Sequence, residues 1–340
     1  MISLEDFLES YSNVGMNPYI VLNDNAPLPM ETTQEDIQIL NIKNPLVKKL
    51  LKGFKLQKNI FKEYTGYLIL LAENSQSSVQ TCFLTSKSGF EQNARNVIVV
   101  EENATLDIFT GCLSSNHVKG NIHNAITDIF VGKNAKLTFN MIHSWGETSK
   151  VFPKTVVHVE EGGTFISNYV VWEKVKEIVS NPQITLEKNA KGVMQSFIYA
   201  HNGSKLDIGG GIYLEGKESS GEIISNIVSE GGEYKTVSEI VGRGDESKGH
   251  IECNAVLLNQ FGSVKTVPTL KAENSSVQMS HEASIGRISR EEIEYLQSKG
   301  LDKKKAQDLI VKGFVNNSLK KMPESIQQKI EEMLSNGSMF

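Results

Sequence analysis

The chain has 340 residues, a formal net charge of -5 and 39% hydrophobic residues. Because a single compact core stops growing at about 250–300 residues, this length predicts several domains or an elongated, stacked architecture. The acidic balance argues against a nucleic-acid-binding protein, which needs a basic face. No apolar run approaches the roughly 20 residues of a membrane-spanning helix, and the opening residues MISLEDFLES lack the features of a signal peptide. We expect a soluble, cytoplasmic protein that binds neither nucleic acid nor membrane.

Residues 1–62 are predicted to form an N-terminal helical cap. The stretch from Thr33 to Gly53 carries apolar residues at helical spacing and ends in a glycine. Pro18, Pro27 and Pro29 interrupt the pattern before it.

Residues 63–285 have a different sequence pattern, which predicts short strands with alternating side chains that are rich in Val, Ile, Thr, Phe and Tyr. Segments such as VVEENATLDIF, FVGKNAKLTFN and VSEGGEYKTVS superimpose on one small corner residue, and the corner spacings cluster near 28 to 31. These corners are at Ala104, Ala135, Gly163, Ala190, Gly232 and Gly262. Such self-similarity predicts a β-solenoid, here a right-handed parallel β-helix. An immunoglobulin-like sandwich array is the alternative, but it explains the recurrent corner less well.

Residues 286–340 are predicted to form a helical C-terminal domain. Ser289 and Glu292 make a capping box, and Gly300 ends that first helix. Asp302 caps a second helix with an apolar face that includes Ala306, Leu309, Ile310 and Phe314, and Pro323 opens a third. We expect this tail to shield the open end of the solenoid and to dock a partner.

The candidate functional residues are Cys253, His281 and Glu282. A thiol, an imidazole and a carboxylate together suit iron or zinc. Taken alone, a cysteine in a strand is more often a core residue than a ligand. Neighbouring residues of a strand point to opposite faces, so His281 and Glu282 face one interior only if the strand ends there. Otherwise each faces a different subunit.

The segment from His281 to Phe314, HEASIGRISREEIEYLQSKGLDKKKAQDLIVKGF, resembles the C-terminal signature of the SufB and SufD proteins of the SUF iron-sulfur cluster assembly system. The preceding rungs resemble that family's last β-helix rungs, and the likeness extends from about Asn116 to Lys320. Cys253 and Glu282 make the chain similar to SufB, the scaffold subunit, while His281 matches a histidine that functions in SufD. The resemblance thus implies a transient iron-sulfur cluster on Cys253, Glu282 and His281, with flavin use left open.

The resemblance also implies partners. SufB-like scaffolds dock a SufC-type ABC ATPase, which we place on the helices from Ser289 to Leu319, and a homodimer through the end of the β-helix is the simplest assembly. SufB chains carry a second cysteine, linked to sulfur entry, in a rung similar to Lys154 to Val159, where this chain has none. Sulfur delivery by a cysteine desulfurase therefore stays open, with Cys112 or Cys82 as possible substitutes.

Other functions have weaker support. The chain has no GxxxxGK[ST] motif, so we expect an assembly scaffold rather than an ATP-hydrolysing enzyme. A SufD-like accessory subunit without its own cluster is the main alternative. A carbohydrate-active β-helix enzyme is a distant one, because the acidic residues lie mainly at corners.

The remaining histidines and cysteines have several possible positions. His117, His123 and His143 with Trp145 lie in neighbouring coils, where they line a cavity or take corner and ladder positions. The three cysteines, an odd number, predict reduced thiols.

Overall fold

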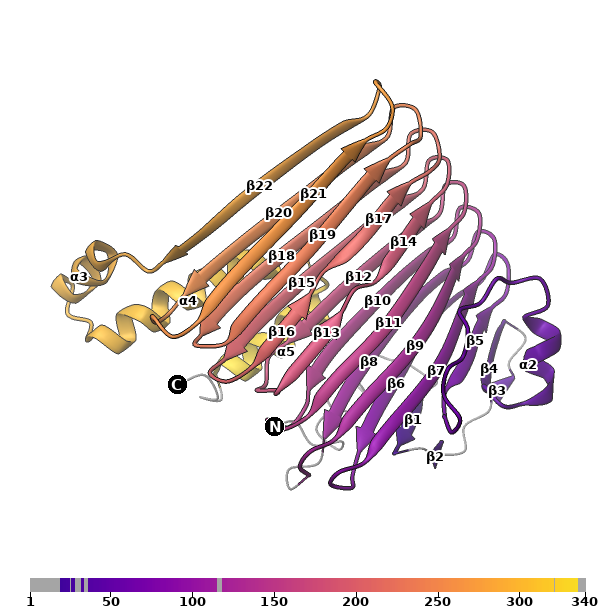
Figure 1. The fold of residues 1–340 in the computed structure, drawn as a ribbon, viewed down its shortest axis with the longest axis horizontal. Helices are drawn as coiled ribbons and strands as arrows, with labels where there is room; N and C mark the ends of the chain where they lie inside the picture. Colours follow the sequence, from indigo (N-terminus) through magenta and orange to yellow (C-terminus); the bar gives the residue numbers. More distant parts are fainter. Residues whose placement is uncertain are drawn as a thin grey trace.

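The chain coils into a long solenoid whose two walls are parallel β-sheets (Figure 1). The computed structural model describes residues 19–24, 26–27, 32–33, 36–114, 118–320 and 322–335. Sheet A contains, in spatial order, β2 (Ala26–Pro27), β1 (Tyr19–Asn23), β6 (Gln76–Thr85), β8 (Thr105–Ser114), β10 (Lys136–Ser144), β12 (Thr164–Val171), β15 (Lys191–His201), β18 (Ser220–Glu230), β20 (Lys248–Leu257) and β22 (Gln278–Arg287).

Sheet B faces sheet A and receives the alternate strands of the chain. It contains β13 (Glu177–Ser180), β16 (Lys205–Ile208), β19 (Glu233–Gly242), β17 (Gly210–Leu214), β14 (Gln183–Leu186), β11 (Lys150–Val159), β9 (Ile122–Val131), β7 (Glu91–Val100), β5 (Tyr67–Leu71), β4 (Ile37–Asn41) and β3 (Thr32–Thr33), and β21 (Ser263–Ala272) pairs with β19. Each turn of the chain therefore adds one layer to both walls.

Paired residues of neighbouring coils confirm the expected repeat. Lys136 lies opposite Thr105, 31 positions away in the chain, and Lys191 lies opposite Thr164, 27 positions away. The strands of neighbouring coils pair in parallel, which confirms the solenoid and excludes the antiparallel sandwich array.

The corners are of two kinds, which the sequence pattern had merged. Corners from sheet B to sheet A place Asn103, Asn134 and Asn189 in the left-handed region, with φ of 57, 54 and 56°. Asparagine tolerates this conformation better than most residues. Gly232 and Gly262 instead lie at corners from sheet A to sheet B, so their alignment with Ala104 was wrong. Both corners favour small residues, and local sequence does not distinguish them.

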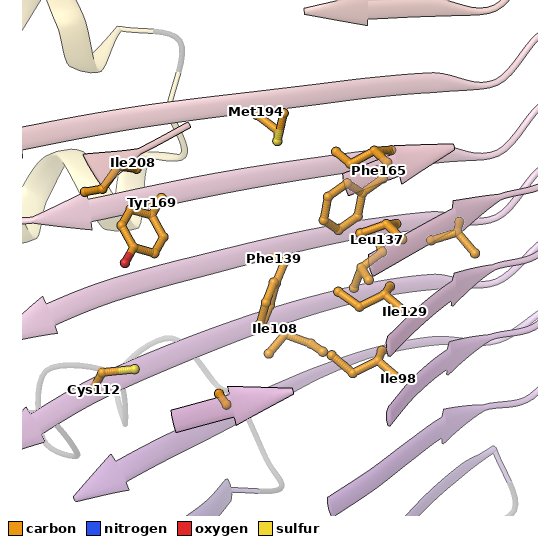
Figure 2. Close-up of a cluster of buried hydrophobic side chains, with 14 of the residues drawn as sticks. Ile98, Ile108, Cys112, Ile129, Leu137, Phe139, Phe165, Tyr169, Met194 and Ile208 are labelled. Carbon is orange, nitrogen blue, oxygen red and sulfur yellow. The ribbon is translucent and has the colours of Figure 1, made fainter. Parts of the chain in front are cut away.

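The core is a continuous apolar column between the sheets. Ile98, Ile108, Ile129, Leu137 and Phe165 point into it from successive strands (Figure 2). Alternate residues of each strand supply this column, as the period of two requires. The stacked coils therefore share one interior, and what lies in it can extend along the axis.

The predicted helix from Thr33 to Gly53 is only partly correct. The helix α2 spans Pro45–Leu50, and Asn44 caps it through the backbone N–H of Leu46. Ile37–Asn41 is instead β4, which pairs antiparallel with β5 and closes that edge of sheet B. Edge pairing and burial of its apolar residues override the helical spacing here. The division at residue 62 stays a prediction.

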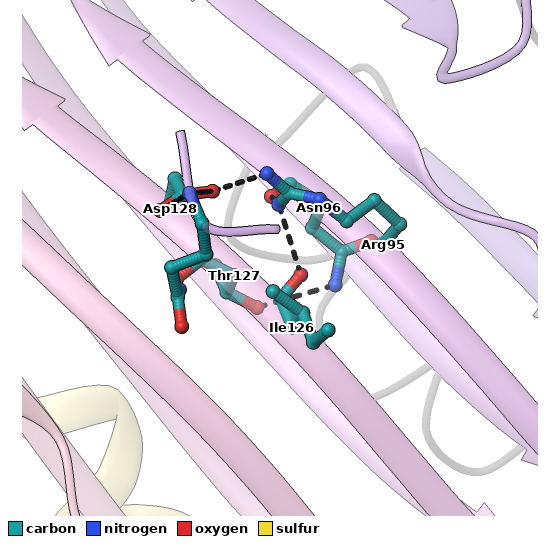
Figure 3. A network of polar contacts seen from close by, with 6 residues as sticks. Arg95, Asn96, Ile126, Thr127 and Asp128 are labelled. Atoms are coloured by element: carbon teal, nitrogen blue, oxygen red, sulfur yellow. Dashed lines mark hydrogen bonds and ion pairs between the residues drawn. The ribbon is translucent and has the colours of Figure 1, made fainter. Parts of the chain in front are cut away.

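A buried ion pair within sheet B is a binding point for the N-terminal region (Figure 3). Arg95 on β7 contacts Asp128 on β9 and donates to the carbonyls of Asn96 and Ile126. The backbone N–H of Gln57 lies 3.2 Å from both carboxylate oxygens of Asp128. The segment after α2 is therefore held against the outer face of sheet B.

The C-terminal helices are α3 (Arg290–Ser298), α4 (Lys303–Leu319) and α5 (Glu324–Ser335). The capping box at Ser289 and the Asp302 cap are both formed, as predicted. The side chains of α4 and α5 that face the solenoid pack on the outer face of sheet A against Phe109, Trp172 and Phe197. The tail therefore covers this face, and the prediction that it shields the open end was wrong. In the described part of the chain, no helix is long and apolar enough to cross a membrane.

Candidate functional site

Cys253 lies on β20, one strand away from the free edge of sheet A. Its side chain points into the solenoid and is 1% exposed. Ser225 of β18 and Ala283 of β22 are its neighbours in register. Burial, followed by the nearby Glu252 carboxylate, raises the pKa of the Cys253 thiol to about 11. The thiol is therefore protonated at neutral pH and is unreactive while the coil stays closed.

His281 and Glu282 lie on opposite faces of β22. The strand continues to Arg287, so the condition under which both side chains would face one interior is not met. His281 is in register with the buried Ile251, and Glu282 with Glu252. Because side chains alternate, His281 shares the interior face with Cys253, whereas Glu282 belongs to the outer face.

The three predicted ligands therefore do not converge within one chain. In the described part of the chain, no group of three or more His, Cys, Asp or Glu side chains is arranged to hold a metal ion. From His281 to Arg287 the interior side chains of β22 are exposed, because no further coil of the described chain covers them. A complete ligand set requires either movement of the last coil or residues of a second subunit.

A cavity of about 80 Å³ lies deeper in the interior, between the two sheets. Cys112, His123, His143 and Tyr169 line it, and it extends to Ser225 beside Cys253. Figure 2 shows Cys112 and Tyr169 pointing into this interior. The sequence left two roles open for His123 and His143, and the structure places both in the cavity lining, while His117 falls outside the described residues.

The cavity histidines are neutral and polar. Trp145 donates from Nε1 to Nδ1 of His143 at 3.0 Å, so the proton of the neutral imidazole lies on Nε2. That Nε2 and the hydroxyl of Tyr169 are buried without a hydrogen-bond partner. Nδ1 of His123 donates to Oε1 of Gln92 at 2.8 Å. Burial lowers the pKa of both histidines to about 3.

The two other thiols have different surroundings. Cys112 faces the cavity, and burial raises its pKa well above the ordinary range. Cys82 points outward, in the apolar cluster that also contains side chains of α4 and α5, and burial raises its pKa to about 12. The two thiols lie on opposite faces of sheet A because side chains alternate along β6 and β8. The register between these strands is needed to see this.

The helical tail presents an exposed apolar surface. Tyr295 on α3 is 62% exposed and Leu309 on α4 is 51% exposed. The predicted apolar face of this helix is only partly correct, because Ala306 is buried with Val311, Val315 and Leu319, whereas Leu309 is not. None of the residues of α3 is buried.

Comparisons with a family model and with curated proteins all indicate one protein family. The family described as "SUF system FeS cluster assembly, SufBD core domain" matches residues 83–314. An iron-sulfur cluster assembly SufBD family protein of Archaeoglobus fulgidus is 40% identical over 275 residues, which cover 80% of this chain and 74% of that protein. A relative of the same description in Methanothermobacter thermautotrophicus is 34% identical, covering 80% and 67%. One from Staphylococcus haemolyticus is 24% identical, covering 84% and 67%.

Proposed function

Because the chain belongs to the SufBD family of the SUF iron-sulfur cluster assembly system, we propose that it is the SufB-like scaffold on which a nascent cluster is built. The observation that carries this proposal is the position of Cys253, which lies one strand from a free sheet edge with His281 on the same interior face. The cluster is the cargo of this protein and not a permanent group.

The chemistry of these side chains suits a temporary ligand set. A thiolate binds iron firmly, whereas imidazole and carboxylate ligands bind iron less firmly than thiolate and let the product leave. Iron binding must displace the proton of the Cys253 thiol, so affinity rises with pH. In this proposal Cys253 and His281 are ligands on the interior face. Glu282 is a ligand from the outer face, and its role rests on the family resemblance.

The proposed ATPase partner binds the tail between Ser289 and Leu319. The exposed Tyr295 supports this, since aromatic side chains are enriched in protein interfaces, and the exposed Leu309 adds apolar surface on the next helix. ATP-driven movement of the docked ATPase would pull on α3, which follows β22 directly. Opening of the last coil would then expose the protonated Cys253 thiol. We further propose a homodimer that carries two ATPase subunits in the cytoplasm.

Sulfur delivery is proposed to involve Cys112, with a cysteine desulfurase as the donor. Cys112 lines the cavity that extends to Ser225, the strand neighbour of Cys253. Cys82 instead faces away from the cavity, in the apolar cluster on the outer face of sheet A. The substitution Cys112→Ser should therefore lower sulfide incorporation, and Cys82→Ser is the matched control that should leave it unchanged.

A SufD-like accessory subunit is the second candidate. It is favoured by one observation, that the described residues of a single chain gather no metal-binding group of three. The two candidates differ in their need for the thiol, since an accessory subunit does not use Cys253.

Anaerobic reconstitution with the ATPase tests the proposal. Wild type, Cys253→Ala and Cys82→Ala are compared by visible absorption and by bound iron and sulfide. We expect wild type and Cys82→Ala to form a cluster and Cys253→Ala to lose it. Equal iron and sulfide in Cys253→Ala would exclude this thiol as a ligand, and no cluster in any variant would support the accessory role.

A further inference from the structure

His143 is held in one orientation and one protonation state inside the solenoid. Its Nδ1 accepts a hydrogen bond from Nε1 of Trp145 at 3.0 Å. Because burial lowers the pKa of His143 to about 3, the ring is neutral near neutral pH and carries its single proton on Nε2. Nε2 is therefore a hydrogen-bond donor, and no acceptor of the described chain lies within its reach.

Tyr169 places a second polar group beside this donor. Its ring centroid lies 4.4 Å from that of His143, and its hydroxyl is buried without a hydrogen-bond partner in the described chain. Both side chains line the cavity between the sheets. Cys112 lines it too and is the neighbour of His143 in register, and Figure 2 shows the hydroxyl of Tyr169 pointing toward the coil that carries Cys112.

Two such groups side by side are unusual in a closed interior. Each has given up its hydrogen bonds to water, and buried polar groups in folded proteins are almost always paired again. The other histidine of the cavity follows this rule, because Nδ1 of His123 bonds to Oε1 of Gln92 at 2.8 Å. The donors of His143 and Tyr169 therefore match an acceptor that is not part of the described chain.

The wall of the cavity selects an uncharged ligand. Among the described residues that line it there is no Asp, Glu, Lys or Arg. Burial lowers the pKa of both His123 and His143 to about 3, so neither carries charge near neutral pH. Apolar side chains such as Phe139, Met141 and Phe165 form much of the wall. An ion would lose its hydration here without gaining an opposite charge.

The volume limits the ligand to two or three non-hydrogen atoms. The cavity measures about 80 Å³, whereas a cavity that holds benzene measures about 150 Å³ and one water molecule takes about 30 Å³. An oxygen atom with two lone pairs can accept from both donors at once. A carbonyl compound of this size, such as a small amide or aldehyde, shares this chemistry with water.

We propose that His143 and Tyr169 form a binding site for a small, uncharged carbonyl compound inside the solenoid, beside Cys112. The carbonyl oxygen accepts one hydrogen bond from Nε2 of His143 and one from the hydroxyl of Tyr169. Water takes the same position when the compound is absent. The site uses neither Cys253 nor His281, so it goes beyond the proposed function and does not depend on it.

Formamide and formate are the probes, because their three non-hydrogen atoms have the same arrangement and only formate is charged. Each is titrated into the full chain with isotope-labelled histidine near neutral pH. Nuclear magnetic resonance follows the Nε2 signal of His143, which is assigned by its loss in His143→Gln. We expect formamide to shift this signal with saturation, at a concentration at least tenfold below that of formate. A shift that does not saturate, or equal saturation by formate, would overturn the site.

Tyr169→Phe removes one of the two donors, and Tyr199→Phe is its matched control. Tyr199 is also buried, but it belongs to the apolar cluster on the outer face of sheet A. Tyr169→Phe should weaken formamide binding about tenfold, and Tyr199→Phe should leave it unchanged. Equal binding by wild type and Tyr169→Phe, or an equal loss in Tyr199→Phe, would contradict the assignment.

Urea unfolding in buffer alone separates water from the carbonyl compound. If water occupies the resting site, Tyr169→Phe loses a hydrogen bond and should unfold at a lower urea concentration than wild type. An unchanged or higher midpoint would mean that the hydroxyl has no partner at all, and this would overturn the proposal. A lower midpoint without formamide binding would leave water as the only occupant and would also overturn it.

Discussion

The thiol of Cys253 should be unreactive in the free protein. The perturbation is the double variant Cys82→Ala and Cys112→Ala, which leaves Cys253 as the only thiol. Burial raises the pKa of Cys253 from 9.0 to about 11, so the thiolate is about 100-fold rarer near neutral pH than in an unfolded chain. The alkylation rate should fall by at least that factor, because the side chain is also 1% exposed.

The assay follows iodoacetamide labelling by mass spectrometry, with the same variant in concentrated urea as the unfolded reference. The labelling rate of the folded protein should rise about tenfold per pH unit up to a pH near 11. Addition of the ATPase with ATP should accelerate the labelling if the last coil opens. A folded rate within tenfold of the urea rate at neutral pH would refute the closed-coil reasoning.

The raised pKa of Cys253 also predicts how the stability of the folded protein changes with pH. Between pH 9.0 and about 11 the unfolded chain has released the proton that folded Cys253 still holds. Unfolding therefore becomes easier as pH rises, by about 1.4 kcal/mol per pH unit for this thiol. Urea titrations should show a smaller alkaline loss of stability in Cys253→Ala than in wild type. An identical loss in both proteins would contradict the raised pKa.

Three further predictions concern the fold and the tail. Arg95→Met should destabilise the protein by about 3–5 kcal/mol in urea unfolding, because it leaves the buried Asp128 carboxylate unpaired, and adding Asp128→Leu should recover part of the loss. Tyr295→Ala with Leu309→Ser should weaken ATPase binding in calorimetry without a change in melting temperature, and unchanged affinity would move the docking face elsewhere. Asn134→Ala should cost about 1–2 kcal/mol at its φ of 54°, whereas Asn134→Gly should be nearly neutral in the same urea titration.

Local patterns in the sequence determined the repeat and the ends of the helices. The spacing of small corner residues predicted a stacked solenoid because each coil must turn at the same place to pair with its neighbour. The Ser289 capping box and the Asp302 cap were predicted because they satisfy backbone groups within three residues. The pairing of a cysteine with a distant His-Glu dipeptide identified the site residues through the family resemblance.

The tertiary structure alone decided which faces and edges these residues occupy. Side chains alternate along each strand, but the sequence does not show how β20 and β22 are aligned. The register between these strands places Cys253 and Glu282 on opposite faces of sheet A. Ile37–Asn41 became a strand because sheet B offered it an edge, and Leu309 became exposed because Val311, Val315 and Leu319 packed on sheet A. Sequence spacing encodes contacts within one coil or one helical turn. The contacts between coils, which decide where the thiol, the imidazole and the carboxylate meet, depend on residues about thirty positions apart and exist only in the stacked chain.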